Sequence, residues 1–486
     1  MPSALLFNPL VQYRFDCIQK VVEDDVVLDT YNDAYSIEEQ SDLNGTYIVR
    51  GNIYTGEQHH EAMFIHDGNI EAVGNYWSVL QLANDTGFAE ELNTIELAER
   101  ECVVPGFVLP RVDWLAGLAT HSWIHLGPFG LQANWQHPMP NYNLHYIGKA
   151  ISYYEKSLPA NQWLIGYGLD EELLPYTPFD NTDTEEHLIN FLDSLAVQRP
   201  ICIFEKHGNV AYVNSLAATA LYLTLDDADR ARYPNIRLFL RFLEQNKGLR
   251  SRQFSWLAKV IPADQLNLSF QSVHELSQSY AFEAIKQGIT AIGVRADESL
   301  LSLVNHSAKP LKVCKTLLQE DTSAIPSCLL GTSIAYPDEI GFDGYNLSRG
   351  GEKLNTETLF PYRTILEQSP MMTFACEFPE RPLGALRLLN HAVNREMLTA
   401  PGYVGIAQRK LHPEEALPLS SALACITSNA ARCLESANQF GALQAGGAAD
   451  FVVLSDNPFI HSVKLEDVHV KQTWVDGKCV YESVIS

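Results

Sequence analysis

The 486-residue chain contains no two cysteines in CxxC spacing, and it lacks any stretch of about 18 apolar residues. Scattered, unpaired cysteines in a long chain are typical of reduced thiols in a cytosolic protein. No basic region followed by an apolar run opens the chain, so we expect no signal peptide. These features predict a cytoplasmic protein without a membrane-spanning helix. The nine cysteines are Cys17, Cys102, Cys202, Cys314, Cys328, Cys376, Cys425, Cys433 and Cys479.

Positive charge is also scarce. The chain has 34 Lys and Arg against 59 Asp and Glu, which gives a net charge of −25 at pH 7. This balance argues against nucleic acid and against anionic membrane surfaces as partners. The hydrophobic content of 46% is that of a globular chain with a large core. We therefore expect a globular protein that binds neither nucleic acid nor anionic membranes.

A buried strand is predicted at the start of VVPGFVLPRVDW, residues 103–114. Two charged residues follow its apolar run, Arg111 and Asp113. Side chains two apart on a strand point to the same face, so these two should share one environment. A guanidinium has no lone pair to give a metal, whereas a carboxylate has. A surface ion pair is the alternative interpretation.

Further patterns predict strands along the rest of the chain. WLIGYGLDEELL (163–174), RPICIFEKHGNVAYVNSLA (199–217) and GITAIGVRADES (288–299) each contain an apolar run that ends at polar residues. Strand-turn-strand patterns occur at both ends, in residues 47–74 and again in 441–459 and 470–482.

Taken together and in this order, the patterns resemble the amidohydrolase superfamily. The branch is the amidohydrolase-3 type, which includes proteins like N-substituted formamide deformylase. Its first strand reads roughly PGFIDAHVHL, and the two metal-binding histidines of that pattern fall on Arg111 and Asp113 here. The resemblance implies an α/β protein: a metal-dependent-hydrolase-like (β/α) TIM barrel, with a β-sandwich domain built from both chain termini.

The resemblance also implies domain bounds. Residues 1–102 and 431–486 would form the composite β-sandwich domain, in which residues 1–46 are an extension without an assigned role. Residues 103–430 would form the barrel. The patterns predict seven barrel strands, whereas a complete TIM barrel contains about eight. Either the barrel is incomplete or the sequence patterns miss one strand. The predicted strands are residues 103–108, 163–168, 201–206, 288–295, 311–318, 327–336 and 371–378.

Other family positions are altered as well. The histidine of the DGH pattern falls on Asn209, its aspartate on His207, and the metal-binding aspartate of the GSDWP pattern on Glu377. We find no counterpart of the family's middle lysine and two histidines between residues 296 and 373. We predict instead that Arg111 forms a charged cluster with Asp113, Glu377 and Asp297, because a guanidinium satisfies buried carboxylates.

A catalytic zinc needs about three protein ligands and one open position. The family positions offer Asp113 and Glu377. His121 and His125 are further candidates because their spacing of four suits one helical face, although ordinary loop histidines would look the same. We predict that the protein has no metal cofactor; a divalent metal such as zinc is the alternative.

Three functions follow from these patterns. We favour an amidohydrolase-like protein that is catalytically inactive or repurposed for small-molecule binding. The alternative is a hydrolase acting on carbon–nitrogen bonds other than peptide bonds, with an unusual metal site. The third is a metal-free enzyme that uses His207, Cys376 or a carboxylate. Because members of the superfamily often form dimers, the resemblance also implies a homodimer.

Overall fold

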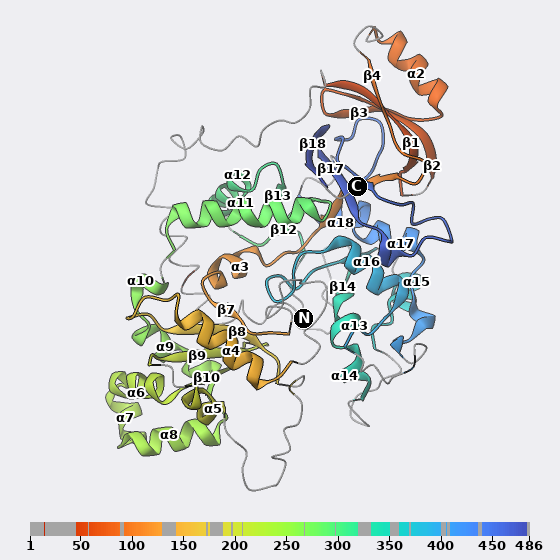
Figure 1. The fold of residues 1–486 in the computed structure, drawn as a ribbon. Helices are drawn as coiled ribbons and strands as arrows, with labels where there is room; N and C mark the ends of the chain where they lie inside the picture. Colours follow the sequence, from red (N-terminus) through yellow and green to blue (C-terminus); the bar gives the residue numbers. More distant parts are fainter. Residues whose placement is uncertain are drawn as a thin grey trace. The chain divides into compact units, whose positions relative to one another are not determined.

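The computed structural model divides into two compact units, which we describe separately. Unit 1 comprises residues 1–24, 113–273 and 377–382, and unit 2 comprises residues 25–112, 274–376 and 383–486 (Figure 1). The described residues are 14, 45–56, 58–87, 92–128, 142–171, 174, 188–195, 198–206, 208–266, 268–296, 298–318, 332–349, 359–368, 371–399, 405, 409–435 and 440–483.

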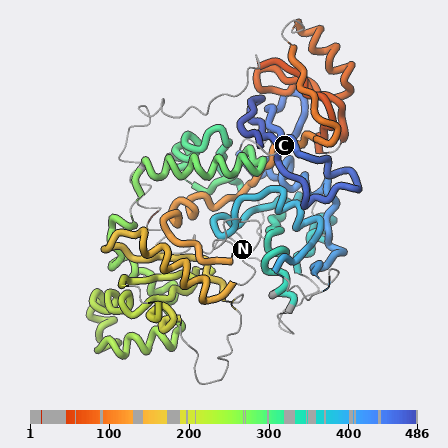
Figure 2. The backbone as a smooth tube through the Cα atoms, in the orientation of Figure 1, coloured from red at the N-terminus to blue at the C-terminus, as the bar shows by residue number. Residues whose placement is uncertain are grey.

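Unit 2 contains an eight-stranded sheet that draws strands from both ends of the chain. Seven strands run in the order β18-β17-β16-β5-β1-β2-β3, and β4 pairs with β1. The antiparallel pairing of β16 with β5 joins the two ends, so red and dark blue segments lie side by side in Figures 1 and 2. The strands are β1 (Thr46–Tyr54), β2 (His59–His66), β3 (Asn69–Gly74), β4 (Asn93–Glu96), β5 (Cys102–Pro105), β16 (Phe451–Leu454), β17 (Val470–Val475) and β18 (Lys478–Glu482).

Local sequence explains the turns and the packing of this sheet. Asp67-Gly68 and Asp476-Gly477 both have positive φ, which is the backbone of a tight hairpin turn. Inside the sheet, the ring of Trp474 stacks on Phe451 at 5.1 Å. The apolar residues that alternate along these strands therefore point to one face of the sheet, where aromatic rings form part of the buried core.

One ion cluster ties the eight-stranded sheet to the parallel strands of unit 2. Lys312 on β13 (Lys312–Lys315) donates to both carboxylate oxygens of Asp450, at 2.9 and 2.7 Å, and to Asp476 at 2.7 Å. The backbone N–H of Asp476 donates to Asp450 as well, at 2.9 Å. Asp450 is the aspartate of the GGAAD pattern, and its role here is structural.

The remaining strands of unit 2 are parallel. β6 (Phe107–Leu109), β12 (Ile289–Val294) and β13 form one group, and β14 (Ser333–Ala335) pairs with β15 (Met372–Phe374). A side chain on Gly106 would collide with Thr290, and one on Gly293 would collide with the carbonyl of Pro110. Both glycines are therefore required by the close approach of β6 and β12.

Helices cover these strands in unit 2 (Figure 1). They are α2 (Tyr76–Asp85), α11 (Phe270–Lys286), α12 (Glu298–Ser307), α13 (Asp338–Phe342), α14 (Gly344–Arg349), α15 (Tyr362–Gln368), α16 (Ala385–Asn394), α17 (Leu419–Cys425) and α18 (Ser428–Ala431), with α11 beginning in unit 1. Within the described residues, no helix is both long enough and apolar enough to cross a membrane.

Unit 1 is organised around a five-stranded sheet of order β11-β10-β9-β8-β7, in which β7, β8 and β9 are parallel. Asn143, Asn214 and Asn235 begin helices α4, α6 and α8 as side-chain N-caps. The elements are β7 (Ile124–His125), β8 (Leu164–Leu169), β9 (Ile201–Glu205), β10 (Val210–Val213), β11 (Leu249–Arg250), α3 (Trp114–Thr120), α4 (Leu144–Glu155), α5 (Leu188–Ser194), α6 (Ser215–Thr224), α7 (Asp227–Arg232), α8 (Ile236–Gln245), α9 (Phe254–Val260) and α10 (Ala263–Leu266).

A fully buried arginine anchors the N-terminal extension to unit 1. The guanidinium of Arg14 donates to the carbonyls of Ala119, Gln265 and Leu266, at the ends of α3 and α10. A cation at a helix C-terminus is stabilised by the helix dipole and by the last, otherwise unpaired carbonyls. Part of the extension is thus integral to unit 1, which the sequence did not indicate.

Candidate active site

The carboxyl ends of three parallel strands meet at one edge of the unit 1 sheet. β7 ends at His125, β8 is followed by Asp170 and Glu171, and β9 ends at Glu205 before Lys206. Parallel α/β folds place ligands and catalytic groups at this edge, because the loops that follow the strands converge there. This edge is therefore the candidate active site of unit 1.

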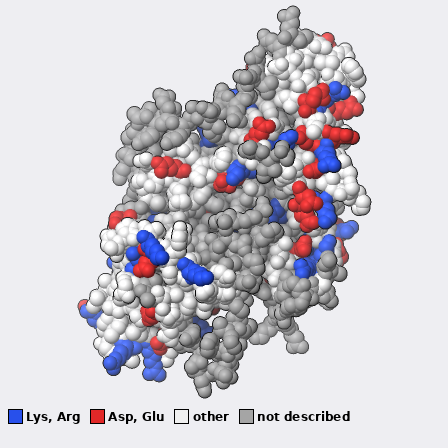
Figure 3. All heavy atoms as spheres, in the orientation of Figure 1, with Lys and Arg blue, Asp and Glu red and all other residues white. Residues whose placement is uncertain are grey.

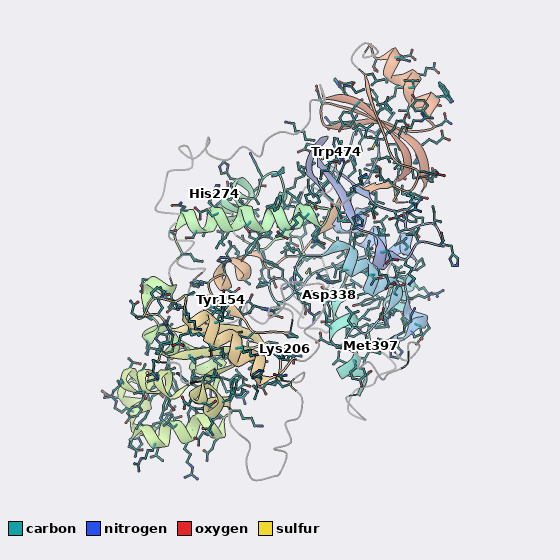
Figure 4. All side chains as sticks on the ribbon, in the orientation of Figure 1. Tyr154, Lys206, His274, Asp338, Met397 and Trp474 are labelled. Carbon is teal, nitrogen blue, oxygen red and sulfur yellow. The ribbon has the colours of Figure 1, made fainter. Side chains whose placement is uncertain are left out.

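A hydrogen-bonded network fixes the middle of this edge. The ammonium of Lys206 donates to Asp170 at 3.1 Å, and Asp170 is only 4% exposed (Figure 4). The backbone N–H of Asp170 donates to the Tyr142 hydroxyl at 3.1 Å, which in turn donates to the carbonyl of Leu126 at 2.8 Å. Burial raises the pKa of Tyr142, so its hydroxyl keeps its proton. The network links the ends of all three strands.

Two further carboxylates lie at the same edge. Burial raises the pKa of Glu171, with Glu205 and Asp170 acting in the same direction and Lys247 and Arg250 opposing them. Glu205 accepts a hydrogen bond from the backbone N–H of Asn209 at 2.9 Å. The edge thus combines acidic and basic groups.

His125 is held by close packing. Its ring meets Tyr167 edge-on at 4.7 Å, and a Cβ added to Gly127 or Gly168 would lie about 3 Å from the imidazole. Burial lowers the pKa of His125 to about 4, although a hydrogen bond with the backbone of Glu380 opposes this shift. The imidazole is therefore neutral near pH 7.

This lowered pKa predicts a pH dependence of stability. An unfolded histidine has a pKa of about 6.5, so the unfolded chain binds a proton that the folded chain excludes. Stability should be complete above about pH 6.5 and should fall as the pH drops toward 4. His125→Gln should reduce this loss, as measured by denaturant unfolding at several pH values in that range. An equally steep loss in the variant would contradict the assignment to His125.

A second ion pair in unit 1 involves Glu377, which the sequence had singled out. Arg381 contacts the Glu377 carboxylate at 2.7 Å, and both side chains are 11% exposed. In the same segment, the ring of Phe378 packs against Trp114 of α3 at 6.2 Å. Glu377 and Arg381 lie in a turn and not in a helix, so no helical periodicity in the sequence indicated this pair.

Residues 343–481 match the sequence model of the amidohydrolase family. Residues 343–481 are amidohydrolase-like in sequence. The predicted resemblance is thereby confirmed.

One curated relative is the N-substituted formamide deformylase of Arthrobacter pascens. It is 28% identical over 139 residues, which are 28% of this chain and 24% of that protein. The matched part therefore spans about a quarter of the relative's length.

A solved structure extends the likeness to the fold. An uncharacterized metal-dependent hydrolase from Pyrococcus furiosus aligns with a TM-score of 0.52 at 14% sequence identity. The alignment covers 85% of this chain and 99% of that one. The chain accordingly has an α/β fold of the amidohydrolase type. At this identity the likeness concerns the fold alone.

The candidate site residues predicted from the sequence are divided between the two units and differ in burial. Arg111 is buried beyond the end of β6 in unit 2, whereas Asp113 and Glu377 are partly buried in unit 1. Asn209 is exposed, and His121 is exposed directly after α3. The predicted cluster around Arg111 stays a prediction. His207 and Asp297 lie outside the described residues.

The two histidines considered as alternative ligands do not share a helix. His121 follows the last residue of α3, and His125 lies in strand β7. Their spacing of four therefore does not place them on one helical face, and the helical interpretation was wrong. The sequence patterns did not predict β7, because this strand is only two residues long.

A buried ion cluster in unit 2 was also missed. Asp338, at the start of α13, accepts two hydrogen bonds from Arg387, at 3.0 and 2.8 Å, and contacts Nδ1 of His391 at 3.0 Å (Figure 4). Asp338 and His391 are each 1% exposed. The only sequence signal was the spacing of four between Arg387 and His391.

The donor set does not fit the metal centre of an amidohydrolase. Within the described part of the chain, no group of three or more His, Cys, Asp and Glu side chains could hold a metal ion. The first-strand histidine positions hold Arg111 and Asp113, and the carboxylate of Glu377 is paired with Arg381. A guanidinium beside the Glu377 carboxylate would repel a divalent cation from the same position, because the two carry like charge.

Proposed function

We propose that this chain is an amidohydrolase-like protein that has lost the family's metal centre and binds a small molecule without hydrolysing it. The observation that carries the proposal is the buried pair of Glu377 and Arg381. Glu377 stands at the position of a metal-binding aspartate in the family pattern, and here a protein cation neutralises it. An arginine cannot supply the activated water that a bound metal supplies.

The ligand site is proposed at the carboxyl ends of β7, β8 and β9. Lys206 and Asp170 form its rigid base, and the neutral ring of His125 supplies a hydrogen-bonding group. Basic and acidic side chains occur together there, which suits a small polar molecule with both donor and acceptor groups. We also propose that the parallel strands form the barrel and that the two chain ends form the composite β domain. The first predicted bound then moves from residue 102 to residue 105, because β5 lies in the eight-stranded sheet.

A hydrolase of non-peptide carbon–nitrogen bonds is the second candidate. It is favoured by the name of the relative, N-substituted formamide deformylase. His125 is neutral near pH 7, which is the protonation state of a histidine ligand. Asp113, Glu377 and His125 would have to converge around the ion.

The test is a panel of amides, N-formyl compounds and ureas, assayed with added zinc. We expect the wild type to turn over none of them faster than Glu377→Gln, because the carboxylate holds no metal. The same compounds should raise the thermal midpoint of the wild type more than that of Lys206→Met. Turnover that is lost in Glu377→Gln and on adding a chelator would support the hydrolase instead.

A further inference from the structure

Unit 1 carries a basic surface although the whole chain is strongly acidic. Residues 230–259 contain eight Lys and Arg and one acidic residue, Glu244, and Asp226, Asp227 and Asp229 directly precede them; the whole chain has 34 basic and 59 acidic residues. Figure 3 shows Lys and Arg gathered over α7 and α8. All eight basic side chains of this basic surface are exposed, namely Arg230, Arg232, Arg237, Arg241, Lys247, Arg250, Arg252 and Lys259.

The helices that present these cations are rigidly packed. The ring of Phe239 lies 5.4 Å from Tyr233 and 6.0 Å from Trp256, in a core shared by α6, α8 and α9. The indole N–H of Trp256 donates to Asp229 of α7 at 3.1 Å. Asp229 also pairs with Arg232 at 3.5 Å, and Asp227 is exposed, so α7 carries charges of both signs while the arginines of α8 have no acidic neighbour in their own first turn.

Exposed leucines are interleaved with the arginines. On α8, Phe239 and Leu243 are buried, while Arg237 and Arg241 face outward with Leu238, which is 44% exposed. Leu223 at the end of α6 is 66% exposed, and Arg230 donates to its carbonyl at 3.0 Å. Cations and aliphatic side chains thus alternate on the outer surface.

We propose that this basic surface docks unit 1 on an anionic phospholipid membrane. Each Lys or Arg near such a surface contributes roughly a fivefold gain in binding, and leucines can enter the boundary of the acyl layer. A nucleic acid would favour exposed aromatic rings for stacking, but the aromatic side chains of residues 230–259 are buried or half-buried. An acidic protein would use the cations without needing the leucines.

The net charge of −25 does not prevent this local attachment. At 0.1 M salt, charges more than about 10 Å from the membrane are largely screened, so the nearest side chains decide the interaction. The prediction from net charge excluded anionic membranes for the chain as a whole. The distribution of charge within unit 1 reverses that expectation for one surface.

The experiment is co-sedimentation of the full chain with vesicles of phosphatidylcholine containing phosphatidylserine, compared with phosphatidylcholine alone, at 0.1 M salt. We expect binding only to the anionic vesicles. Arg237→Glu with Arg241→Glu should weaken it by at least about 30-fold. The matched control is Arg363→Glu with Lys464→Glu, which makes the same charge change at two exposed residues of unit 2 and should leave binding intact.

A second variant separates the possible partners. Leu223→Ser with Leu238→Ser keeps every charge and should still weaken vesicle binding. Failure of the wild type to bind anionic vesicles would overturn the proposal. So would equal loss in both charge-reversal variants, or binding to RNA or to an acidic peptide that the leucine variant retains. Circular dichroism and the thermal midpoint of each variant establish that it is folded.

Discussion

Replacement of Asp338 by asparagine is expected to lower the free energy of unfolding by about 3 kcal/mol or more. Asp338 is fully buried and accepts charge-assisted bonds from Arg387 and His391. An amide cannot neutralise the guanidinium, so the variant leaves a buried cation without its anion. Chemical denaturation at pH 7 measures the difference.

The loss should depend on pH in a defined direction. Burial alone would raise the pKa of Asp338, but Arg387 and the hydrogen bond from His391 outweigh it and hold the pKa well below its ordinary value. A lowered carboxyl pKa contributes stability that is complete above about pH 4 and is lost as the pH falls further. The difference between wild type and Asp338→Asn should therefore shrink below about pH 4. A difference that stays constant down to pH 2 would contradict this assignment.

Arg395→Met should cost about 3 kcal/mol or more of unfolding free energy. Arg395 is fully buried and donates to the carbonyls of Leu411, at 2.8 Å, and Phe360, at 3.0 Å. Its guanidinium also lies over the ring of Tyr362, at 5.4 Å. Methionine fills a similar volume but donates nothing, so the carbonyl of Leu411 loses this donor and the carbonyl of Phe360 keeps only the backbone N–H of Tyr362.

The backbone near Arg395 makes the side chain more important. Phe360, Arg395 and His412 all have positive φ, at 53°, 59° and 46°, which is costly for residues other than glycine. The guanidinium bonds to Phe360 and to Leu411, the neighbour of His412, and so holds this strained region together. Arg363→Met is the control, because Arg363 is exposed and only pairs with Glu367 on the same helix. Equal effects of the two substitutions would show that Arg395 has no special role.

Long apolar runs made most of the fold predictable. Strands at 164–169, 201–205 and 289–294 lie within or beside their predicted ranges, because each is buried over all or nearly all of its length. The short strand β7 escaped, since two residues give no periodicity. Arg14 escaped as well, because nothing in a single arginine indicates that it caps α3 and α10.

The candidate site was less predictable than the fold. The family pattern directed attention to Glu377, and the predicted cluster paired it with Arg111. The contact with Arg381, four residues further along in a turn, was not predicted. Asp338 and its partners are separated by 49 and 53 residues, so no local pattern joins them. Lys206 follows a strand, and its bond to Asp170 depends on the pairing of β8 with β9. Contacts of this kind come from the fold and not from residue spacing.

The most direct test of the proposed loss of the metal centre is the zinc content of the purified chain. The protein is expressed with supplemented zinc, dialysed, and analysed for metal per chain, with Glu377→Gln as the matched variant. Because Arg381 pairs with Glu377 and the first-strand positions are Arg111 and Asp113, both proteins should contain far less than one zinc per chain. Near-stoichiometric zinc in the wild type, lost in Glu377→Gln, would contradict the account and restore a metal-dependent hydrolase.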